Sequence, residues 1–291
     1  FTTKCDADIA KNNVIDGSPT GVKTGCMKWY AFEEDANSYK MILDHNIAVH
    51  VGWISQADYE QTASKTATPS QVGITYYSDE VSMTEDGKLP AGTWDSSGTS
   101  SGTNNRGPIT LLKQLQEDTK DWVAVEILTE DDAYTAEWEA CTECSGDIYE
   151  GPQKYTINYN GYKARLISGE EINKITGKGE VTTSTIQRGY LDSNCTGSCS
   201  KGTNKYGWLF DHTGVGVPPG TNGAPSCESN GCNSGLNSDY MYWTSSPDVH
   251  SYRSAWGVDL YGNFLVLDVD YTANFGARPV IKVSKSNIFE S

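Results

Sequence analysis

The sequence has no long apolar run and few positive charges. No stretch of roughly eighteen or more apolar residues occurs among its 291 residues, so the sequence predicts no membrane-spanning helix. Only 22 residues are Lys or Arg, against 38 Asp or Glu, which gives a formal net charge of -16. A surface this acidic repels phosphate backbones and anionic lipids. We therefore expect no nucleic-acid partner and no membrane contact by this fragment.

Apolar residues are also scarce, at 37% of the chain, but 8 Trp and 17 Tyr compensate because buried aromatics remove large apolar areas from water. The length suits a single elaborated domain over residues 1–291, with residues 1–25 as an N-terminal lead-in. No signal peptide is recognised and Phe1 is not an initiator Met, so we expect a processed or trimmed chain. An anchor upstream of residue 1 stays open.

The motifs of common enzymes and cofactor sites are missing. There is no HExxH, GxSxG, P-loop or GxGxxG motif, and no EF-hand loop. His45 and His50 are five residues apart, so on one strand they would face opposite sides, which argues against a shared metal. Asp268 and Asp270 could flank a sugar as glycosidase carboxylates do, but their alternation with apolar residues favours the solvent face of a strand. We expect no catalytic residue, no metal and no cofactor.

The eight cysteines fall in short-range pairs within segments rich in Gly, Ser, Thr and Asn. Such segments have few apolar side chains that could pack in a core, and a local disulfide would restrict their conformation instead. Proximity alone favours Cys5–Cys26, Cys141–Cys144, Cys195–Cys199 and Cys227–Cys232 out of on the order of a hundred pairings. The alternative is zinc, since "CTEC" has the spacing of half a site, but no second half completes it. Disulfides predict an exported, oxidising location.

The first half of the chain predicts strands and one helix. Residues 27–53 have the aromatic and β-branched composition of strands, with a turn in "EEDANS". Residues 87–107 form a Gly/Ser/Thr/Asn loop that is longer than a routine connection. A helix opens at Pro108, and Ile109, Leu112 and Leu115 form its apolar stripe.

The next segment predicts a hairpin and a second helix. In "QKYTINYNGYKARLI", Asn160-Gly161 is the strongest short hairpin signal. Ser168 and Glu171 form a capping box that would start a short helix. "YGWLFD", within the loop-rich residues 177–241, predicts a buried element. Two helices among short strands and very long loops indicate an α+β fold with an antiparallel sheet as its core.

The C-terminal segment alternates apolar anchors with polar and aromatic residues. Trp256, Val258 and Leu260 share one strand face, which we expect to lie toward the core. After a turn at Gly262-Asn263, residues 265, 267 and 269 share a face, and residues 264, 266, 268 and 270 share the other. That outward set mixes aromatic, aliphatic and acidic side chains, and such a mixture is typical of a recognition surface. An ordinary sheet surface with stray aromatics is the plainer alternative.

These residues resemble a known family. "ARLISGEEINKI", followed far downstream by "YWTSSP", "AWGV" and "GARPVIKV", resembles the C-type lectin fold. The resemblance is closest to the branch shared by formylglycine-generating-enzyme-like domains and the variable proteins of diversity-generating retroelements. It covers roughly residues 155–285 well and residues 25–125 weakly. It implies a C-type lectin-like fold with small antiparallel sheets, two helices and long disulfide-pinned loops.

The departures from the family pattern narrow the function. The Glu-Pro-Asn, Gln-Pro-Asp and Trp-Asn-Asp motifs of calcium-dependent sugar binding are absent, and Ser246-Pro247-Asp248 only partly echoes them. The oxidases of this branch bind copper through a cysteine pair in their core, but no cysteine follows Cys232. The resemblance therefore argues against calcium-mediated lectin activity and against oxidase activity.

In the retroelement-diversified members, a C-terminal segment is rewritten at adenines while its apolar scaffold stays fixed. By position, the variable segment would be residues 242–285, and Trp243, Trp256, Gly276, Arg278 and Pro279 would be its scaffold. The residues expected to form the ligand-binding display surface are Asp248, His250, Ser251, Tyr252, Arg253, Asp259, Tyr261, Asn263, Asp268, Asp270, Tyr271 and Asn274.

The expectation is an exported ligand-binding or adhesion protein, secreted or on the surface of a bacterium or encoded by a phage. Its partner would be a protein or glycan on another cell or surface. Two alternatives stay open: an enzyme, either a formylglycine-generating-type oxidase or a glycosidase, and a structural pilus-tip subunit. Pilus or surface assembly would use a pilin-like segment ahead of residue 1.

Overall fold

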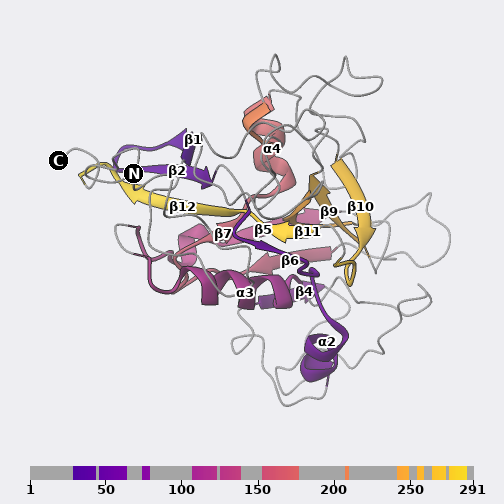
Figure 1. Cartoon of the computed structure of the whole chain (residues 1–291). Coiled ribbons are helices and arrows are strands. Elements are labelled where there is room, and N and C mark those ends of the chain that lie inside the picture. Colours follow the sequence, from indigo (N-terminus) through magenta and orange to yellow (C-terminus); the bar gives the residue numbers. More distant parts are fainter. Residues whose placement is uncertain are drawn as a thin grey trace.

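The fold is a mixed α+β arrangement of small sheets and few helices (Figure 1). The computed structural model describes residues 29–43, 46–63, 74–78, 107–122, 125–138, 153–176, 207–209, 241–248, 254–258, 264–272 and 275–286. All eight cysteines lie outside these ranges, and the disulfide pairs expected from the sequence stay predictions.

A four-stranded antiparallel sheet has the order β1-β2-β12-β7. Its strands are β1 (Trp29–Glu34), β2 (Ser38–Leu43), β12 (Pro279–Ser284) and β7 (Arg165–Leu166). The β1–β2 turn is closed by the Asp35 carboxylate, which accepts hydrogen bonds from the Ser38 hydroxyl and from two backbone N–H groups. The strands and turn expected between residues 27 and 43 are therefore confirmed, but the strand expected to continue to residue 53 is wrong, since only residues 48 and 49 are strand in 46–53.

A five-stranded sheet has the order β10-β9-β8-β11-β3. Its strands are β10 (Phe264–Asp268), β9 (Ser254–Val258), β8 (Met241–Pro247), β11 (Phe275–Ala277) and β3 (Ala48–Val49). Strand β11 runs parallel to β8, and the other neighbours are antiparallel. Arg278 stands between β11 and β12, so the chain passes there from this sheet into the four-stranded one.

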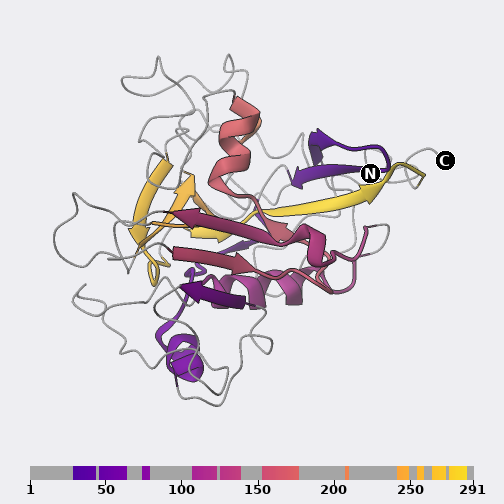
Figure 2. The ribbon, with the colours of Figure 1, turned by 180° about the vertical axis from the view of Figure 1, so that it is seen from behind.

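A third, three-stranded antiparallel sheet has the order β4-β6-β5. Its strands are β4 (Ile74–Ser78), β6 (Gln153–Ile157) and β5 (Tyr134–Trp138). Figure 2 shows these strands side by side with helix α3 behind them. The hairpin expected around Asn160-Gly161 is wrong, because β6 pairs with β4 and β5 whereas β7 pairs with β12.

A turn does exist at Asn160-Gly161, but it is of another type. Gly161 has a φ of 85°, and the Tyr162 N–H donates to the Tyr159 carbonyl at 2.9 Å. Asn160 is not among the residues with positive φ. A two-residue type I′ hairpin needs positive φ at both central residues, so this turn redirects the chain without pairing its flanks.

Three α-helices are described: α2 (Gln56–Ala63), α3 (Ile109–Thr119) and α4 (Gly169–Thr176). Helix α3 buries its predicted stripe of Ile109, Leu112 and Leu115. At α4, the predicted capping box is confirmed, since Glu171 N donates to Ser168 Oγ at 3.1 Å and Ser168 N donates to Glu171 Oε2 at 3.0 Å. Helix α2 was not expected, although Asp58 N bonds to Ser55 Oγ at its start.

The five-stranded sheet is buried on both faces. Odd-numbered residues such as Trp243, Ala255 and Phe275 lie in a first core, which helix α3 also lines. A second core lies on the other face, where helix α4 covers it; its buried members are Ile42, Ile167, Ile172, Leu209, Tyr242, Trp256, Val258 and Val280. Trp256 and Val258 are buried as expected, but Val266, expected to face outward, packs against this second core. Both faces of β10 therefore contact buried clusters, whereas we expected one face to contact the core and the other to contact solvent.

Candidate functional site

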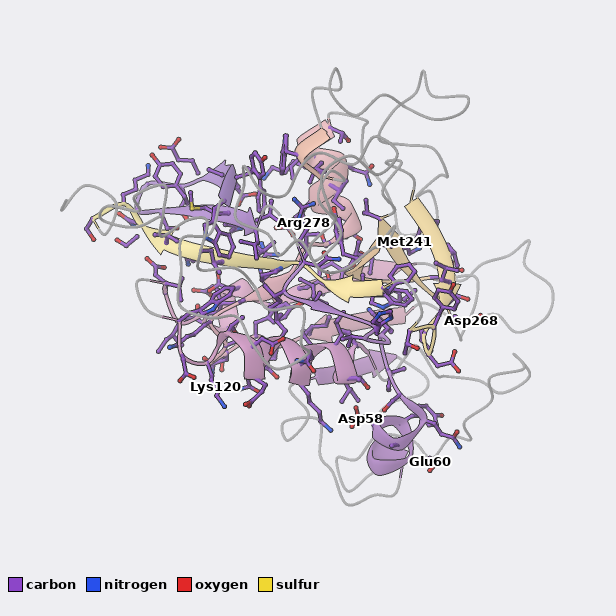
Figure 3. All side chains as sticks on the ribbon, in the orientation of Figure 1. Asp58, Glu60, Lys120, Met241, Asp268 and Arg278 are labelled. Carbon is purple, nitrogen blue, oxygen red and sulfur yellow. The ribbon has the colours of Figure 1, made fainter. Side chains whose placement is uncertain are left out.

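Several of the predicted display residues lie at one end of the five-stranded sheet, where β8 ends, β9 begins and β10 ends. Asp268 pairs with Ser254 across the β10–β9 ladder, and the Asp248 N–H donates to the Ser254 carbonyl at 3.0 Å. We call Asp248, Ser254 and residues 268–272 the distal end. Met241, at the start of β8, marks the opposite end of the same sheet, and both Met241 and Asp268 are labelled in Figure 3.

A tight turn follows β10 and presents an aromatic side chain. The Tyr271 N–H donates to the Asp268 carbonyl at 2.9 Å. Tyr271 is 37% exposed, and it is one of two large hydrophobic residues that are exposed in the described part of the chain. Its ring meets the buried Phe275 ring edge to face, with centroids 6.0 Å apart. An aromatic side chain that packs on a buried ring and keeps part of its surface exposed can bury apolar area against a partner. It loses little conformational entropy when it does so.

The segment before helix α2 supports this turn from beneath. The Ile54 N–H donates to the Val269 carbonyl at 3.0 Å. A Cβ on Gly52 would lie 3.3 Å from the Val269 carbonyl oxygen and 3.4 Å from Thr272 Cγ2. The two backbones therefore approach closely at Gly52, and a side chain there would press lightly on the turn. The turn thus rests on a rigid and fully buried base formed by Trp53 and Ile54.

Strand β8 reaches the distal end through a bulge. The register with β9 pairs Trp243 with Gly257 and Pro247 with Ala255, so three residues of β8 face one residue of β9. Thr244 Oγ1 donates to the Trp256 carbonyl at 2.9 Å and replaces a lost ladder contact. Bulges bend a strand and re-aim the residues after the bend, and they occur often beside functional sites.

The bulge is fixed by contacts from distant parts of the chain. The Trp53 indole N–H donates to the Thr244 carbonyl at 3.0 Å, and the Ser245 N–H donates to the Ile167 carbonyl at 2.9 Å. Thr244, Ser245 and Ser246 are all fully buried. The polar "TSS" triplet therefore meets its hydrogen-bonding needs through specific partners, as buried polar groups must.

A polar network joins the bulge to two other elements. The Tyr134 hydroxyl of β5 lies 2.9 Å from Ser246 Oγ and 3.1 Å from Glu170 Oε1. Ser246 Oγ also donates to Glu170 Oε2 at 3.2 Å and accepts the Gly169 N–H at 3.0 Å. Burial, and then the Glu170 carboxylate, raise the pKa of Tyr134 well above its usual value, so its hydroxyl keeps its proton.

Glu171, the residue after Glu170, forms a buried ion pair with Arg165. Arg165 is 6% exposed and donates from Nη1 and Nη2 to the two carboxylate oxygens of Glu171, at 2.7 and 2.5 Å. A two-pronged contact of this kind fixes orientation as well as charge. Glu171 also belongs to the capping box, so the pair ties the start of helix α4 to strand β7.

Arg278 holds the two larger sheets and a distant turn together. It is fully buried, and its guanidinium donates to the Leu43, Leu209 and Trp208 carbonyls at 2.6, 2.7 and 2.6 Å. The Tyr242 ring lies 5.2 Å from its Cζ. Trp208 and Leu209 belong to a single 3₁₀ turn, Gly207–Leu209, which contains the buried element expected in "YGWLFD".

Four of the twelve predicted display residues are described, and they share the distal end: Asp248, Asp268, Asp270 and Tyr271. Asp268 and Asp270 are half-buried and Tyr271 is exposed, but Asp248 is only 6% exposed. The resemblance predicted an exposed display position for Asp248, but the residue is buried beside the end of β8, where its N–H bonds to the Ser254 carbonyl. The remaining eight lie outside the described residues: His250, Ser251, Tyr252, Arg253, Asp259, Tyr261, Asn263 and Asn274.

The five predicted scaffold residues, Trp243, Trp256, Gly276, Arg278 and Pro279, are all buried. Sequence reasoning missed Tyr134, Glu170 and Ser246 as partners, since they lie 36 to 112 residues apart. The run of small hydroxyl residues after Trp243 is a signal for Ser246 alone, and it does not indicate its partners.

Among the described residues, no group of three or more His, Cys, Asp and Glu side chains is placed to hold a metal ion. In the same part of the chain, no helix has both the length and the apolar character needed to cross a membrane.

Comparison with known proteins gives no relative for this chain. No protein-family model matches it, and neither the curated proteins nor the solved structures include a significant match.

Proposed function

We propose that this chain is an exported ligand-binding protein that serves adhesion or receptor recognition through the distal end of its five-stranded sheet. Binding occurs by contact without chemistry, on a C-type lectin-like scaffold whose long loops are held by disulfides. The partner is a protein or glycan on another cell or surface, and residues 242–285 carry the variable positions.

One observation carries the proposal: an exposed aromatic side chain and two half-exposed carboxylates are gathered on a base that is buried throughout. Tyr271, Asp268 and Asp270 stand on a turn fixed by Ile54 and Phe275. Rigid aromatic anchors with adaptable polar neighbours are the composition of recognition surfaces. A pre-formed base lowers the entropic cost of ordering such a surface on binding.

The contrast within residues 242–285 supports the variable segment. Most described residues of this segment's strands are buried in one of the two cores. Tyr271 and Thr272, in the turn after β10, are exposed. A segment with such a division can exchange the residues of its turn while its fold persists. A genomic locus without a reverse transcriptase gene, and without a near copy of this segment mismatched only at adenines, would remove this part of the proposal.

The binding test uses a glycan array together with a panel of displayed cell-surface ectodomains. We expect at least one specific interaction that Tyr271→Ala weakens by about tenfold or more, because truncating an aromatic anchor costs on the order of 2 kcal/mol. The melting temperature should stay nearly unchanged. Tyr252→Ala and Tyr261→Ala extend the test to the display residues outside the described ranges.

Ile127→Ala is the matched control, because Ile127 is the other exposed large hydrophobic residue of the described ranges and is 63% exposed. It should leave the same interaction intact. If Ile127→Ala and Tyr271→Ala weaken binding equally, or if neither has an effect, the distal end is not the binding surface.

A further inference from the structure

The contact between strand β8, helix α4 and strand β5 lies immediately before the distal end. Ser246 is fully buried and is followed by Pro247 and Asp248, the corner at which β8 turns toward β9. The Ser246 hydroxyl bonds to the side chains of Tyr134 and Glu170, and each of these comes from another element. The position of this corner is thus connected to parts of the fold outside the five-stranded sheet.

The bulge explains why such contacts are needed. Residues 244–246 of β8 have a single facing residue on β9, so the regular ladder does not fix their backbone. Their conformation depends on hydrogen bonds that reach in from elsewhere. A hydrogen bond to a charged group is stronger than one between neutral groups, and linked bonds in a buried network strengthen one another. The carboxylate of Glu170 supplies that charge, and the Gly169 N–H at the start of α4 supplies a further donor.

We propose that Tyr134, Glu170 and Ser246 are positioning residues, which hold the Pro247–Asp248 corner in one conformation and so set the shape of the distal end. The consequence for binding rests on the proposed function, but the positioning itself does not. The plainer alternative is a staple that stabilises the whole fold uniformly.

Backbone amide hydrogen exchange of the full chain separates these two roles. In Tyr134→Phe, the ring still packs against the first core while its hydroxyl is lost. We expect exchange at the amides of Asp248 and Gly169 to accelerate about tenfold or more, which corresponds to roughly 1.4 kcal/mol of local opening. The amides of Val51 and Glu126, which bond to Phe275 and Lys282 in other regions, should keep their rates. Equal acceleration at all four amides, or no change at Asp248, would overturn the proposal.

Two further variants keep the test decisive. Ser246→Ala should accelerate the same two amides, and Ser246→Thr, which retains a hydroxyl, should restore part of the protection. Thr135→Val is the matched control, because Thr135 adjoins Tyr134 in β5 and its hydroxyl bonds to that of Thr156 at 3.1 Å on the exposed face. Acceleration at Asp248 in Thr135→Val would show a general loosening of the three-stranded sheet, which contradicts a positioning role.

The outcomes distinguish this inference from the proposed function. If Tyr134→Phe loosens Asp248 while Tyr271→Ala leaves every interaction on the arrays intact, positioning stands and the distal end is not the binding surface. If Tyr271→Ala abolishes binding while Tyr134→Phe leaves exchange at Asp248 unchanged, the surface stands and the positioning role is wrong.

Discussion

At the centre of the five-stranded sheet residues 255–258 of β9 are all buried, whereas at the distal end Asp268, Asp270 and Tyr271 keep contact with solvent. The two regions are separated by only a few residues of the same segment. In the centre, Trp243 stacks on Phe275 with ring centroids 4.0 Å apart, and both rings are fully buried. At the distal end, the backbone is held by hydrogen bonds, while the side chains of Tyr271 and Thr272 are exposed. The packing at the centre of the five-stranded sheet therefore specifies the fold, and the exposed side chains at the distal end are available for binding a partner.

Substitutions at two glycines can test this difference between the centre and the distal end by measuring stability. Gly257 lies in the centre, in β9, and Gly52 lies beneath the turn at the distal end. A Cβ on Gly257 would collide with the ring of Phe275 and lie 3.0 Å from the Tyr242 carbonyl oxygen. A Cβ on Gly52 would come no closer than 3.3 Å to any atom outside its neighbours. Substitution by Ala at the two positions should therefore have very different effects.

Gly257→Ala should produce the largest loss of stability. The Phe275 ring is fully buried and stacked on Trp243, so it has little room to shift, and overpacking of a core typically costs about 1–3 kcal/mol and occasionally more. We expect a loss at the upper end of this range, about 3 kcal/mol, because the new Cβ would meet the ring well inside contact distance. Urea unfolding followed by Trp fluorescence measures the change. The double variant Gly257→Ala/Phe275→Leu should lose clearly less than the sum of the two single variants. A strictly additive result would show that the ring contact is not the cause.

Arg278→Met should have the next largest effect. The variant fills a similar volume but removes the Arg278 donors from the Leu43 and Trp208 carbonyls, while the Leu209 carbonyl keeps the Tyr242 hydroxyl as a donor at 2.7 Å. Each buried polar group that loses its partner costs about 1–3 kcal/mol. We expect a total loss of roughly 3 kcal/mol in the free energy of unfolding. Lys285→Met is the control, since Lys285 carries the same charge on a more exposed side chain. If the two variants destabilise equally, net charge and not the buried donors would explain the loss.

The buried faces of helix α3 and strand β9 and the start of helix α4 could be predicted from the sequence, because their sequence signals are local or periodic. The stripe of Ile109, Leu112 and Leu115 and the Ser168–Glu171 pair each lie within two turns of one helix. The alternation around Trp256 likewise needs only neighbours in sequence. Such patterns follow from helix and strand geometry. The structure confirms the stripe and the capping box and places Trp256 and Val258 in one core, but it buries the other described residues of β9 as well.

The failures all involve partners that are distant in sequence. The Asn160-Gly161 dipeptide predicts a turn but not which strands its flanks join, and β6 and β7 belong to different sheets. The outward face assigned to Val266 ignored helix α4 and the four-stranded sheet, which cover that face. Helix α2 has a weak apolar pattern, so its Ser55–Asp58 cap was the one usable signal. The network around Ser246 depends on three elements, and no local pattern encodes it.

Asp118 lies on helix α3, which lines the first core, and its carboxyl should have a smaller, pH-dependent effect on stability. Burial raises the pKa of this α3 carboxyl to about 6, although Gln114 Nε2 donates to it, and nearby Glu117 adds to the rise. The folded state thus binds this proton more tightly than the unfolded chain does. The destabilising contribution is fully present above about pH 6 and fades as the pH falls toward 4.

Asp118→Asn should therefore stabilise the protein at neutral pH by about 1 kcal/mol, a value reduced from the full shift because the group is partly exposed. The gain should shrink steadily as the pH falls from about 6 toward 4, because the carboxyl of the folded protein is then protonated. Unfolding midpoints in urea between pH 4 and pH 8 measure this difference. A gain that is independent of pH would assign the effect to helix propensity instead.

Gly52→Ala should produce the smallest change in stability and the most informative change in shape. Contacts at 3.3–3.5 Å require the Val269–Thr272 turn to give by a few tenths of an ångström, which costs little at an exposed turn. The lost backbone freedom of the unfolded chain offsets that cost by about 0.4–1 kcal/mol, so the net change should lie within about 0.5 kcal/mol. The amide chemical shifts of Asp270 and Tyr271 should nevertheless move while those of Gly257 and Phe275 stay. If Gly52→Ala instead unfolds the chain as Gly257→Ala should, the distal end is as tightly specified as the centre and is unsuited to variation.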